Sequence, residues 1–142
     1  MFHYSWCADS AAKYGALYTY AAAKDACPTG WHLPTDNEWT ELTNYIAADG
    51  HSGTEGAALK AISGWNSDGN GTDNYGFTAL PGGHRSYNNG SFYYASIRGL
   101  WWSSTEIGSS NAWYRSLDYT NAYVGRYIYN KSYRVSVRCV RD

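Results

Sequence analysis

Three cysteines carry the most distinctive chemistry in this chain: Cys7, Cys27 and Cys139. A catalytic cysteine needs an electropositive setting that stabilises its thiolate, and His3 is the only basic side chain in the short segment around Cys7. Cys27 and Cys139 have two interpretations: a disulfide formed in an oxidising compartment, or two buried reduced thiols that pack as small apolar groups. The disulfide would leave Cys7 as a free thiol or a site of intermolecular pairing.

The polar loop over residues 65–74 carries oxygen ligands of the kind that calcium accepts, from Asp68, Asn70 and Asp73. Their spacing is not that of an EF-hand loop, and the glutamate that closes such a loop is missing. Asn and Asp side chains in a Gly-rich loop commonly bond to the backbone of turns instead. We therefore expect no metal and no other cofactor, with calcium at these three residues as the less favoured alternative.

Catalytic motifs are not evident elsewhere in the sequence. It contains no H-E-x-x-H, no G-x-S-x-G and no phosphate-binding loop. His32 lies in a Trp-His-Leu-Pro segment, His51 in a polar loop, and His84 follows a Pro-Gly-Gly turn. With these motifs missing and the histidines in structural or loop segments, we expect that the protein is not an enzyme and has no catalytic residue.

Non-covalent binding is the chemistry that the composition favours. Residues 85–142 contain nine of the 15 tyrosines, together with all seven arginines and many Asn, Ser and Gly residues. The formal charge changes from about −6 over residues 1–84 to about +5 over residues 85–142. Tyrosine with small polar residues is typical of recognition surfaces. The alternative is an ordinary tyrosine-rich antiparallel sheet.

The overall composition limits the partners. A chain of 142 residues predicts one domain, 1–142. It is 44% hydrophobic and 16% charged with a net charge of −1, which argues against disorder and against nucleic-acid binding. No apolar stretch is long enough to cross a membrane. No apolar run near Met1 resembles a signal peptide, so we expect that the protein stays inside the cell or that its leader lies outside this sequence.

Helix signals occupy the first half of the chain. We predict an early strand at 14–20 and then helices over three segments: 21–26, about 36–48 and about 55–62. A capping box from Thr35 to Glu38 begins the second helix, and Thr54 is the expected N-cap of the third.

Strand signals follow, separated by Gly, Asn and Ser. The strand-like segments are 77–80, 100–103, 112–119, 122–129 and 133–140. In the last segment Val135, Val137 and Cys139 alternate with polar residues, and Trp101 and Trp102 place one ring on each side of their strand. Helices followed by strands predict an α+β domain, with two main helices packed on antiparallel sheets and residues 1–13 as an N-terminal extension.

The order of four features resembles the C-type lectin fold. They are a helix ending in Cys27, a Gly-Trp-His-Leu-Pro segment, a capped helix with Glu38 and Trp39, and a last strand with Cys139. More closely, the chain is similar to the bacterial Fibrobacter major paralogous domain, of the formylglycine-generating-enzyme-like subtype of this fold. The matching pieces are residues 14–39 (YGALYTYAAAKDACPTGWHLPTDNEW), 59–65 (LKAISGW), 69–83, 101–106 (WWSSTE), 112–117 and 130–142. They cover nearly the whole chain.

This resemblance implies a disulfide, because the first-helix cysteine of C-type lectins pairs with the last-strand cysteine. Calcium-dependent sugar binding is not implied, since the Glu-Pro-Asn, Gln-Pro-Asp and Trp-Asn-Asp motifs of sugar-binding lectins are missing from the sequence. The related proteins include sulfatase-modifying enzymes and the variable proteins of diversity-generating retroelements. In the retroelement systems a reverse transcriptase mutates adenines, so that Asn codons come to encode Tyr, Ser, Asp, Gly and similar residues on one exposed face.

The resemblance makes residues 112–134 a candidate variable region, followed by an invariant end. The candidate ligand-binding residues are Tyr114, Ser116, Asp118, Tyr119, Asn121, Tyr123, Gly125, Tyr127, Tyr129, Asn130 and Tyr133. Arg115 and Arg126 are expected to steer acidic ligands, and Arg115 is also a possible structural partner of Glu106.

The expected function is non-catalytic recognition, of the receptor or adhesin type. The expected partner is a protein or glycan on another cell or host surface. The expected location is extracellular, on a bacterial cell surface or a phage particle. Two alternatives remain: a non-diversified structural or assembly module of a surface or secreted protein, and, less favoured, a sulfatase-modifying-type enzyme.

Overall fold

The computed structural model describes residues 12–142, so Cys7 and most of the predicted extension at 1–13 lie outside the described residues. Its helices are α2 (Tyr20–Lys24), α3 (Asp36–Ile46), the π-helical turn η1 (Ala47–His51) and α4 (Glu55–Leu59). Its strands are β1 (Trp31–His32), β2 (His84–Arg85), β3 (Phe92–Tyr93), β4 (Arg98–Ile107), β5 (Asn111–Asp118), β6 (Gly125–Asn130) and β7 (Val140–Arg141).

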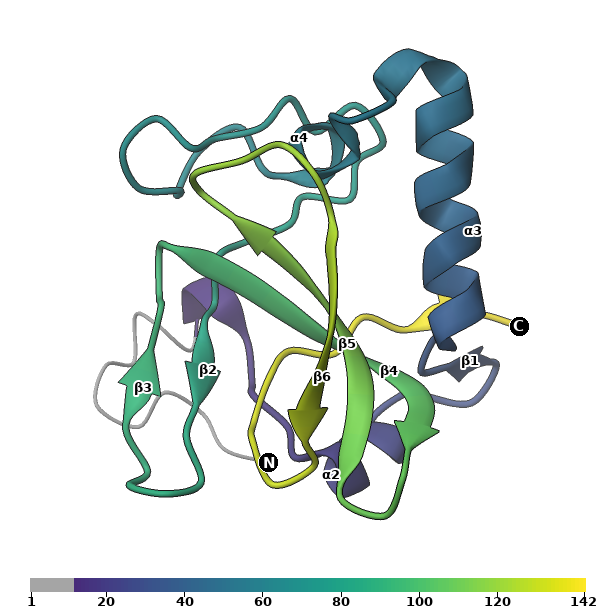
Figure 1. Cartoon of the computed structure of the whole chain (residues 1–142), viewed down its shortest axis with the longest axis vertical. Coiled ribbons are helices and arrows are strands. Elements are labelled where there is room, and N and C mark those ends of the chain that lie inside the picture. The colour runs from purple at the N-terminus through teal and green to yellow at the C-terminus, as the bar shows by residue number, and fades with distance from the viewer. Residues whose placement is uncertain (1–11) are drawn as a thin grey trace.

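Three small antiparallel sheets organise the chain. Strands β4, β5 and β6 form the central sheet in that order, β1 pairs with β7, and β2 pairs with β3. In Figure 1 the helix α3 stands along one side of the central sheet, α4 lies beyond one end of it, and the β2–β3 hairpin flanks the opposite side. Helices and small antiparallel sheets confirm the α+β class. No helix within residues 12–142 is long and apolar enough to span a membrane.

Helix α3 forms where the capping box predicts it. The Thr35 hydroxyl accepts a hydrogen bond from the Glu38 N–H at 3.1 Å, and Glu38 accepts one from the Thr35 N–H at 2.8 Å. The α-helix ends at Ile46, before the predicted end at 48, because the chain continues as a π-helical turn to Gly50, which has a φ of 96°.

Helix α4 begins at the predicted residue, but its predicted N-cap is wrong. The Thr54 hydroxyl donates to the carbonyl of His51 at 3.1 Å and caps no helical N–H. The helix ends at Leu59 rather than at 62, because Lys60 turns to an extended conformation with a ψ of 141° and bridges to Ala79.

Four predicted strands are shorter than expected: 122–129 is observed as β6, which begins only at Gly125, and three others retain little more than isolated bridges. The segment 77–80 retains only the bridge at Ala79, since Thr78 has a φ of +51°, which an extended strand does not tolerate. The segment 14–20 is reduced to isolated bridging, with Tyr18 opposite Val135. The segment 133–140 bridges in turn to Tyr18, Arg85 and Trp101 before β7 pairs with β1, so it has no continuous neighbour.

The central sheet has two different faces, because side chains alternate along each strand. We call the helix face the side that packs on α3, with Trp101, Trp113, Arg115, Leu117, Arg126, Ile128 and Asn130. We call the pocket face the opposite side, with Arg98, Leu100, Trp102, Ala112, Tyr114, Ser116, Asp118, Gly125, Tyr127 and Tyr129.

Each face contributes to its own hydrophobic cluster. On the helix face Trp101 and Leu117 pack with Trp39 of α3. On the pocket face Trp102 packs with Tyr20 of α2 and with the C-terminal segment. Both tryptophan rings are therefore core residues, and the pocket face is covered only at the end of the sheet near Trp102.

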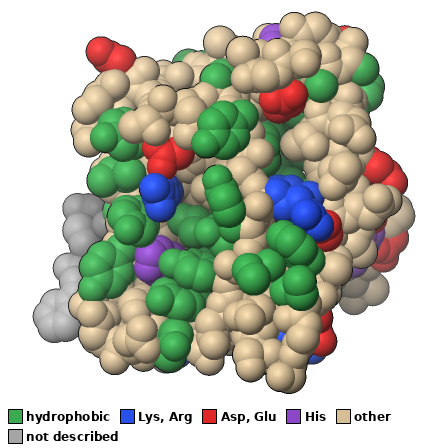
Figure 2. Space-filling model, in the orientation of Figure 1, with side chains coloured by type: hydrophobic (Ala, Val, Ile, Leu, Met, Phe, Trp, Pro, Cys, Tyr) green, Lys and Arg blue, Asp and Glu red, His purple; other side chains and the backbone are tan. Residues whose placement is uncertain are grey.

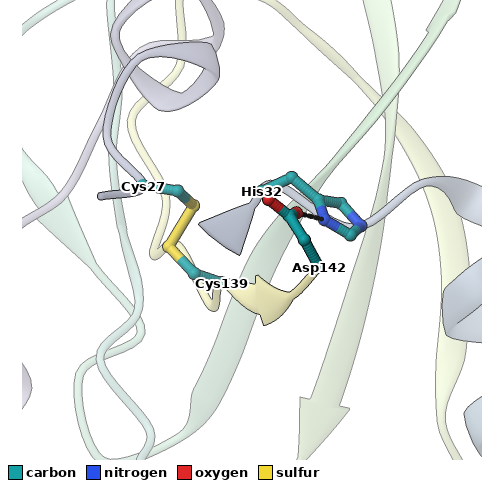
Figure 3. The surroundings of a disulfide bond; sticks show 4 residues. All are labelled: Cys27, His32, Cys139 and Asp142. Atoms are coloured by element: carbon teal, nitrogen blue, oxygen red, sulfur yellow. Dashed lines mark hydrogen bonds and ion pairs between the residues drawn. A yellow bond between two sulfur atoms is a disulfide. The ribbon is translucent and has the colours of Figure 1, made fainter. Parts of the chain in front are cut away.

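The two ends of the domain meet at a disulfide (Figure 3). Cys27, just after α2, is joined to Cys139, just before β7, with the Cα atoms 5.7 Å apart. Beside it the His32 ring lies 2.7 Å from the Asp142 carboxylate and 2.8 Å from that of Glu38. These hydrogen bonds, first with Asp142 and then with Glu38, raise the pKa of His32.

Candidate ligand-binding pocket

A cavity of about 360 Å³ opens on the uncovered end of the pocket face. Its floor is the part of the sheet around Leu100, Tyr114 and Ser116, and its walls come from the 118–125 segment and the β2–β3 region. Figure 2 presents this side of the molecule, where green side chains gather over the central sheet and the β2–β3 hairpin.

Eight of the 11 predicted binding residues line this cavity. They are Tyr114, Ser116, Asp118, Asn121, Tyr123, Gly125, Tyr127 and Tyr129. Alternation along β5 and β6 explains six of the eight, because every second residue of these strands lies on the pocket face, whereas Asn121 and Tyr123 come from the loop between the strands.

The other three predicted binding residues lie elsewhere. Tyr119 packs against the cluster on the helix face. Asn130 lies on the helix face of β6, and its side-chain carbonyl accepts the Ser132 N–H at 2.9 Å. Tyr133 stacks on Tyr129 with ring centroids 4.0 Å apart and lines a neighbouring cavity.

The predicted role of two arginines as ligand-steering groups is wrong. Arg115 is 3% exposed on the helix face, where it donates to the carboxylate and the carbonyl of Asp36. Arg126 also binds the Asp36 carboxylate, at 2.8 Å, and lies 3.7 Å over the Trp113 ring. The pair predicted between Arg115 and Glu106 is wrong too, since Glu106 pairs with Lys131 at 3.3 Å.

Five lining residues lie outside the predicted set: His84, Tyr94, Arg98, Leu100 and Thr120. Arg98 could have been found by extending the predicted strand at 100–103 by two residues, which places it opposite Asp118. His84 and Tyr94 carry no such signal, because they reach the cavity through the two-residue strands β2 and β3 and the loop that follows β3.

The loop between β5 and β6 is held by its backbone. The buried Lys60 ammonium donates to the carbonyls of Asp118 at 3.1 Å and Asn121 at 2.9 Å. The Ala57 N–H donates to the carbonyl of Ala122 at 2.9 Å. Burial lowers the pKa of Lys60, while Asp118 acts in the opposite direction. Because these contacts use only backbone atoms of the loop, they do not depend on its side chains.

Two glycines allow this close packing. A Cβ at Gly56 would collide with the carbonyl of Tyr123, and one at Gly69 would collide with Tyr119. The β5–β6 loop therefore rests directly on the backbones of α4 and of the 65–74 loop.

The charged groups of the cavity form one ion pair. Arg98 Nε donates to the Asp118 carboxylate at 2.6 Å, and the guanidinium lies 4.7 Å over the Tyr94 ring. Asp118 also accepts from the N–H and the hydroxyl of Thr120. Burial opposes ionisation of Asp118, but the hydrogen bonds from Thr120 and Arg98 hold its pKa below the usual value.

An aromatic cluster surrounds a neutral histidine at the cavity wall. His84 lies within 5.5 Å of the ring centroids of Tyr93, Tyr94, Tyr129 and Tyr133. Burial, assisted by the charge of Arg98, lowers the pKa of His84 to about 4. Burial also raises the pKa of Tyr114 to about 12 and raises that of Tyr129, so both hydroxyls stay protonated as hydrogen-bond donors.

Two buried polar atoms at this cavity have no hydrogen-bond partner within residues 12–142: His84 Nδ1 and Asn121 Oδ1. Buried polar atoms are nearly always paired, so an unpaired atom in a cavity wall is a position where a ligand or water gains a hydrogen bond. The cavity thus combines exposed aromatic rings with unsatisfied polar groups, a chemistry suited to recognition.

Two of the three predicted calcium ligands, Asn70 and Asp73, are engaged in hydrogen bonds with nearby residues. Asn70 accepts the Trp65 N–H at 3.0 Å, and Asp73 accepts both the N–H and the hydroxyl of Thr78. In the described part of the chain, no three His, Cys, Asp or Glu side chains are grouped as metal ligands.

The fold and the cavity define a small α+β domain with one tyrosine-rich concave surface on its central sheet. The sequence profile of the Fibrobacter succinogenes major domain matches residues 3–141, and the chain belongs to this family. Neither a curated protein nor a solved structure matches the chain.

Proposed function

We propose that this domain is a non-catalytic ligand-binding module, with the open end of the pocket face as its binding surface. The observation that carries the proposal is the convergence of nine residues of the 112–134 region on one cavity. Tyrosine rings there are rigid anchors that bind at a low cost in conformational entropy.

The scaffold that we propose is C-type lectin-like, and the region 112–134 resembles that of a diversity-generating retroelement variable protein. Two features support this proposal. The bond between Cys27 and Cys139 has the pairing that the resemblance implies. Lys60 and Ala57 hold the backbone of the 118–124 loop at Asn121 and Ala122, and the Asp118 carboxylate holds it at the Thr120 N–H, so the side chains of Asn121 and Tyr123 are not needed for this task. Such a loop tolerates replacement of these side chains.

A binding role is better supported than catalysis. Both cysteines of residues 12–142 are joined in the disulfide, so neither provides a thiolate. The cavity carboxylate, Asp118, already accepts three hydrogen bonds. The proposed partner is a protein or glycan on another cell or host surface, and the proposed setting is a bacterial cell surface or a phage particle.

The test uses a ligand retained by the wild-type domain from an array of peptides and glycans. We expect Tyr123→Ala and Tyr127→Ala to weaken its binding by about 1–3 kcal/mol each, the usual range for an aromatic anchor. The matched control is Tyr45→Ala, because Tyr45 is an exposed tyrosine on α3, away from the cavity. Unchanged affinity in both cavity variants, with the fold intact by circular dichroism, would remove this face as the binding surface.

A further inference from the structure

Arg98 is the one permanently cationic side chain among the residues that line the cavity. Its Nε is bonded to Asp118 and its guanidinium lies over Tyr94, which together restrain its orientation. Its terminal nitrogens have no hydrogen bond to any residue of 12–142, and the side chain is 45% exposed. Arg98 therefore presents unused donors to the cavity.

The partner of Arg98 does not offer matching acceptors. Asp118 accepts from Arg98 and twice from Thr120, and its side chain is 14% exposed. The pair is neutral as a whole, yet its free hydrogen-bonding capacity is almost entirely that of a donor. A ligand that binds at this point of the cavity therefore needs a hydrogen-bond acceptor.

The surroundings of Arg98 add donors and no competing charge. Its charge acts on the hydroxyls of Tyr114 and Tyr129, which remain protonated, and the nearby His84 is neutral. A planar guanidinium with free terminal N–H groups matches the two oxygens of a carboxylate. Arginine binds carboxylates more selectively than lysine does, because its donors form a fixed fork.

The rim of the cavity indicates what kind of molecule carries this carboxylate. Exposed tyrosine rings line it: Tyr94, Tyr123 and Tyr127 are each at least 42% exposed. Tyrosine around a central arginine is the residue composition of protein–protein hot spots.

We propose that the cavity binds the carboxylate of an aspartate or glutamate side chain on a partner protein, with Arg98 as the bidentate anchor. The inference rests on the proposed function, since it names the chemistry that the same cavity recognises.

The test is a titration of the isotope-labelled domain, followed by nuclear magnetic resonance, with N-acetylglutamate amide and its neutral match N-acetylglutamine amide. We expect the acid to bind at least about tenfold more tightly and to shift the Arg98 side-chain signal. Arg98→Gln should abolish this preference. The matched control is Arg126→Gln, because Arg126 is equally exposed and also paired with an aspartate, but lies on the helix face; it should keep the preference.

A second measurement avoids dependence on the fold of the Arg98 variant. In the wild-type domain, raising the salt concentration from 50 to 500 mM should weaken binding of the acid and leave that of the amide unchanged, because salt screens the charge of an exposed arginine. Equal affinity for acid and amide, or the same loss in Arg126→Gln as in Arg98→Gln, would overturn the inference. The inference would also be overturned if glucuronate bound more tightly than N-acetylglutamate amide, because the ligand of the cavity would then be an acidic sugar.

The outcomes separate this inference from the proposed function. If the acid preference is absent while Tyr123→Ala and Tyr127→Ala lose the array ligand, the function stands and the carboxylate inference falls. If the acid preference is present while both tyrosine variants keep the array ligand, the cavity binds acids but is not the surface that recognises that ligand.

Discussion

Two arginines on opposite faces of the central sheet, Arg115 and Arg98, differ in burial and in the number of hydrogen bonds that they form. Arg115 on the helix face is 3% exposed and bonded to Asp36 and Thr40 of α3. Arg98 on the pocket face is 45% exposed and has one hydrogen bond, to Asp118. Each lies beside an aspartate, but only Arg98 keeps donors for another molecule.

The difference follows from what covers each face. Helix α3 and α4 complete a core on the helix face, whereas α2 and the C-terminal segment cover only one end of the pocket face. Alternation along β5 therefore places Arg115 and Leu117 against the core, and it places Tyr114 and Ser116 in the cavity that we propose as the binding surface. Variants of the two faces should divide in the same way.

The largest expected effect lies away from both faces. Replacing Cys27 and Cys139 together with Ser removes a crosslink between residues 112 positions apart, and the chain-entropy argument gives a loss of about 4–5 kcal/mol in the free energy of unfolding. Denaturant titration measures it. The folded variant should bind the array ligand with unchanged affinity; a loss of affinity in proportion to stability would mean that the cavity depends on the crosslink.

Next in size is the contrast between the two arginines. Arg115→Ala removes the buried one of the two arginines that bind Asp36 and leaves Arg126 as the remaining partner, so it should cost about 3 kcal/mol, the lower end of the range for a broken buried pair. Arg98→Ala removes an exposed pair and should cost about 1 kcal/mol or less. Thermal unfolding of the two variants compares them directly. Equal destabilisation would contradict the division between the faces.

A third prediction concerns acid. His84 is 4% exposed, and its pKa is lowered to about 4 from an ordinary value of 6.5. Between pH 6.5 and 4, His84 is protonated in the unfolded chain but neutral in the folded one. The free energy of unfolding therefore falls as the pH drops from 6.5 towards 4, by up to about 3 kcal/mol. His84→Phe, which keeps an aromatic ring among the tyrosines, should flatten this decline. An unchanged pH profile in the variant would assign the acid sensitivity to another group.

The smallest expected effect is the contribution of His32 to stability, which falls with rising pH, whereas that of His84 falls with dropping pH. Hydrogen bonds with Asp142 and Glu38 raise the pKa of His32, so its contribution is fully present below pH 6.5 and is lost as the pH rises through the folded value. His32→Gln should remove a shallow decline in the free energy of unfolding as the pH rises above 6.5. A decline of the same slope in the variant would show that these contacts do not stabilise the C-terminal strand.

Local signals in the sequence were sufficient for several elements of the fold. The capping box at Thr35 and Glu38 predicts the start of α3 because both bonds form within one turn. The strands β4 and β5 are long enough for alternation to be visible. By contrast, β2 and β3 have two residues each, too few for an alternation of side chains to be visible. Thr78 interrupts a predicted strand because its φ is positive, and the residue pattern does not predict this angle.

The candidate site divides in the same way. Alternation within 112–134 predicts Tyr114, Ser116 and Tyr127 on one face. His84 and Tyr94 reach the same cavity from segments distant in sequence, and only tertiary packing brings them there. Charge alone misassigned Arg115, because a sequence does not show which face of a strand the helix α3 covers.

The most direct test of the binding face is DNA sequencing of the locus across several isolates. We predict a reverse-transcriptase gene and a near-copy of the segment encoding residues 112–142, with differences confined to adenines. The codons that differ should encode residues of the cavity, such as Tyr114, Ser116 and Tyr127, and should spare Trp113, Arg115 and Leu117 of the helix face. Equal variation on the two faces, or a locus with neither the gene nor the near-copy, would contradict a diversified binding surface.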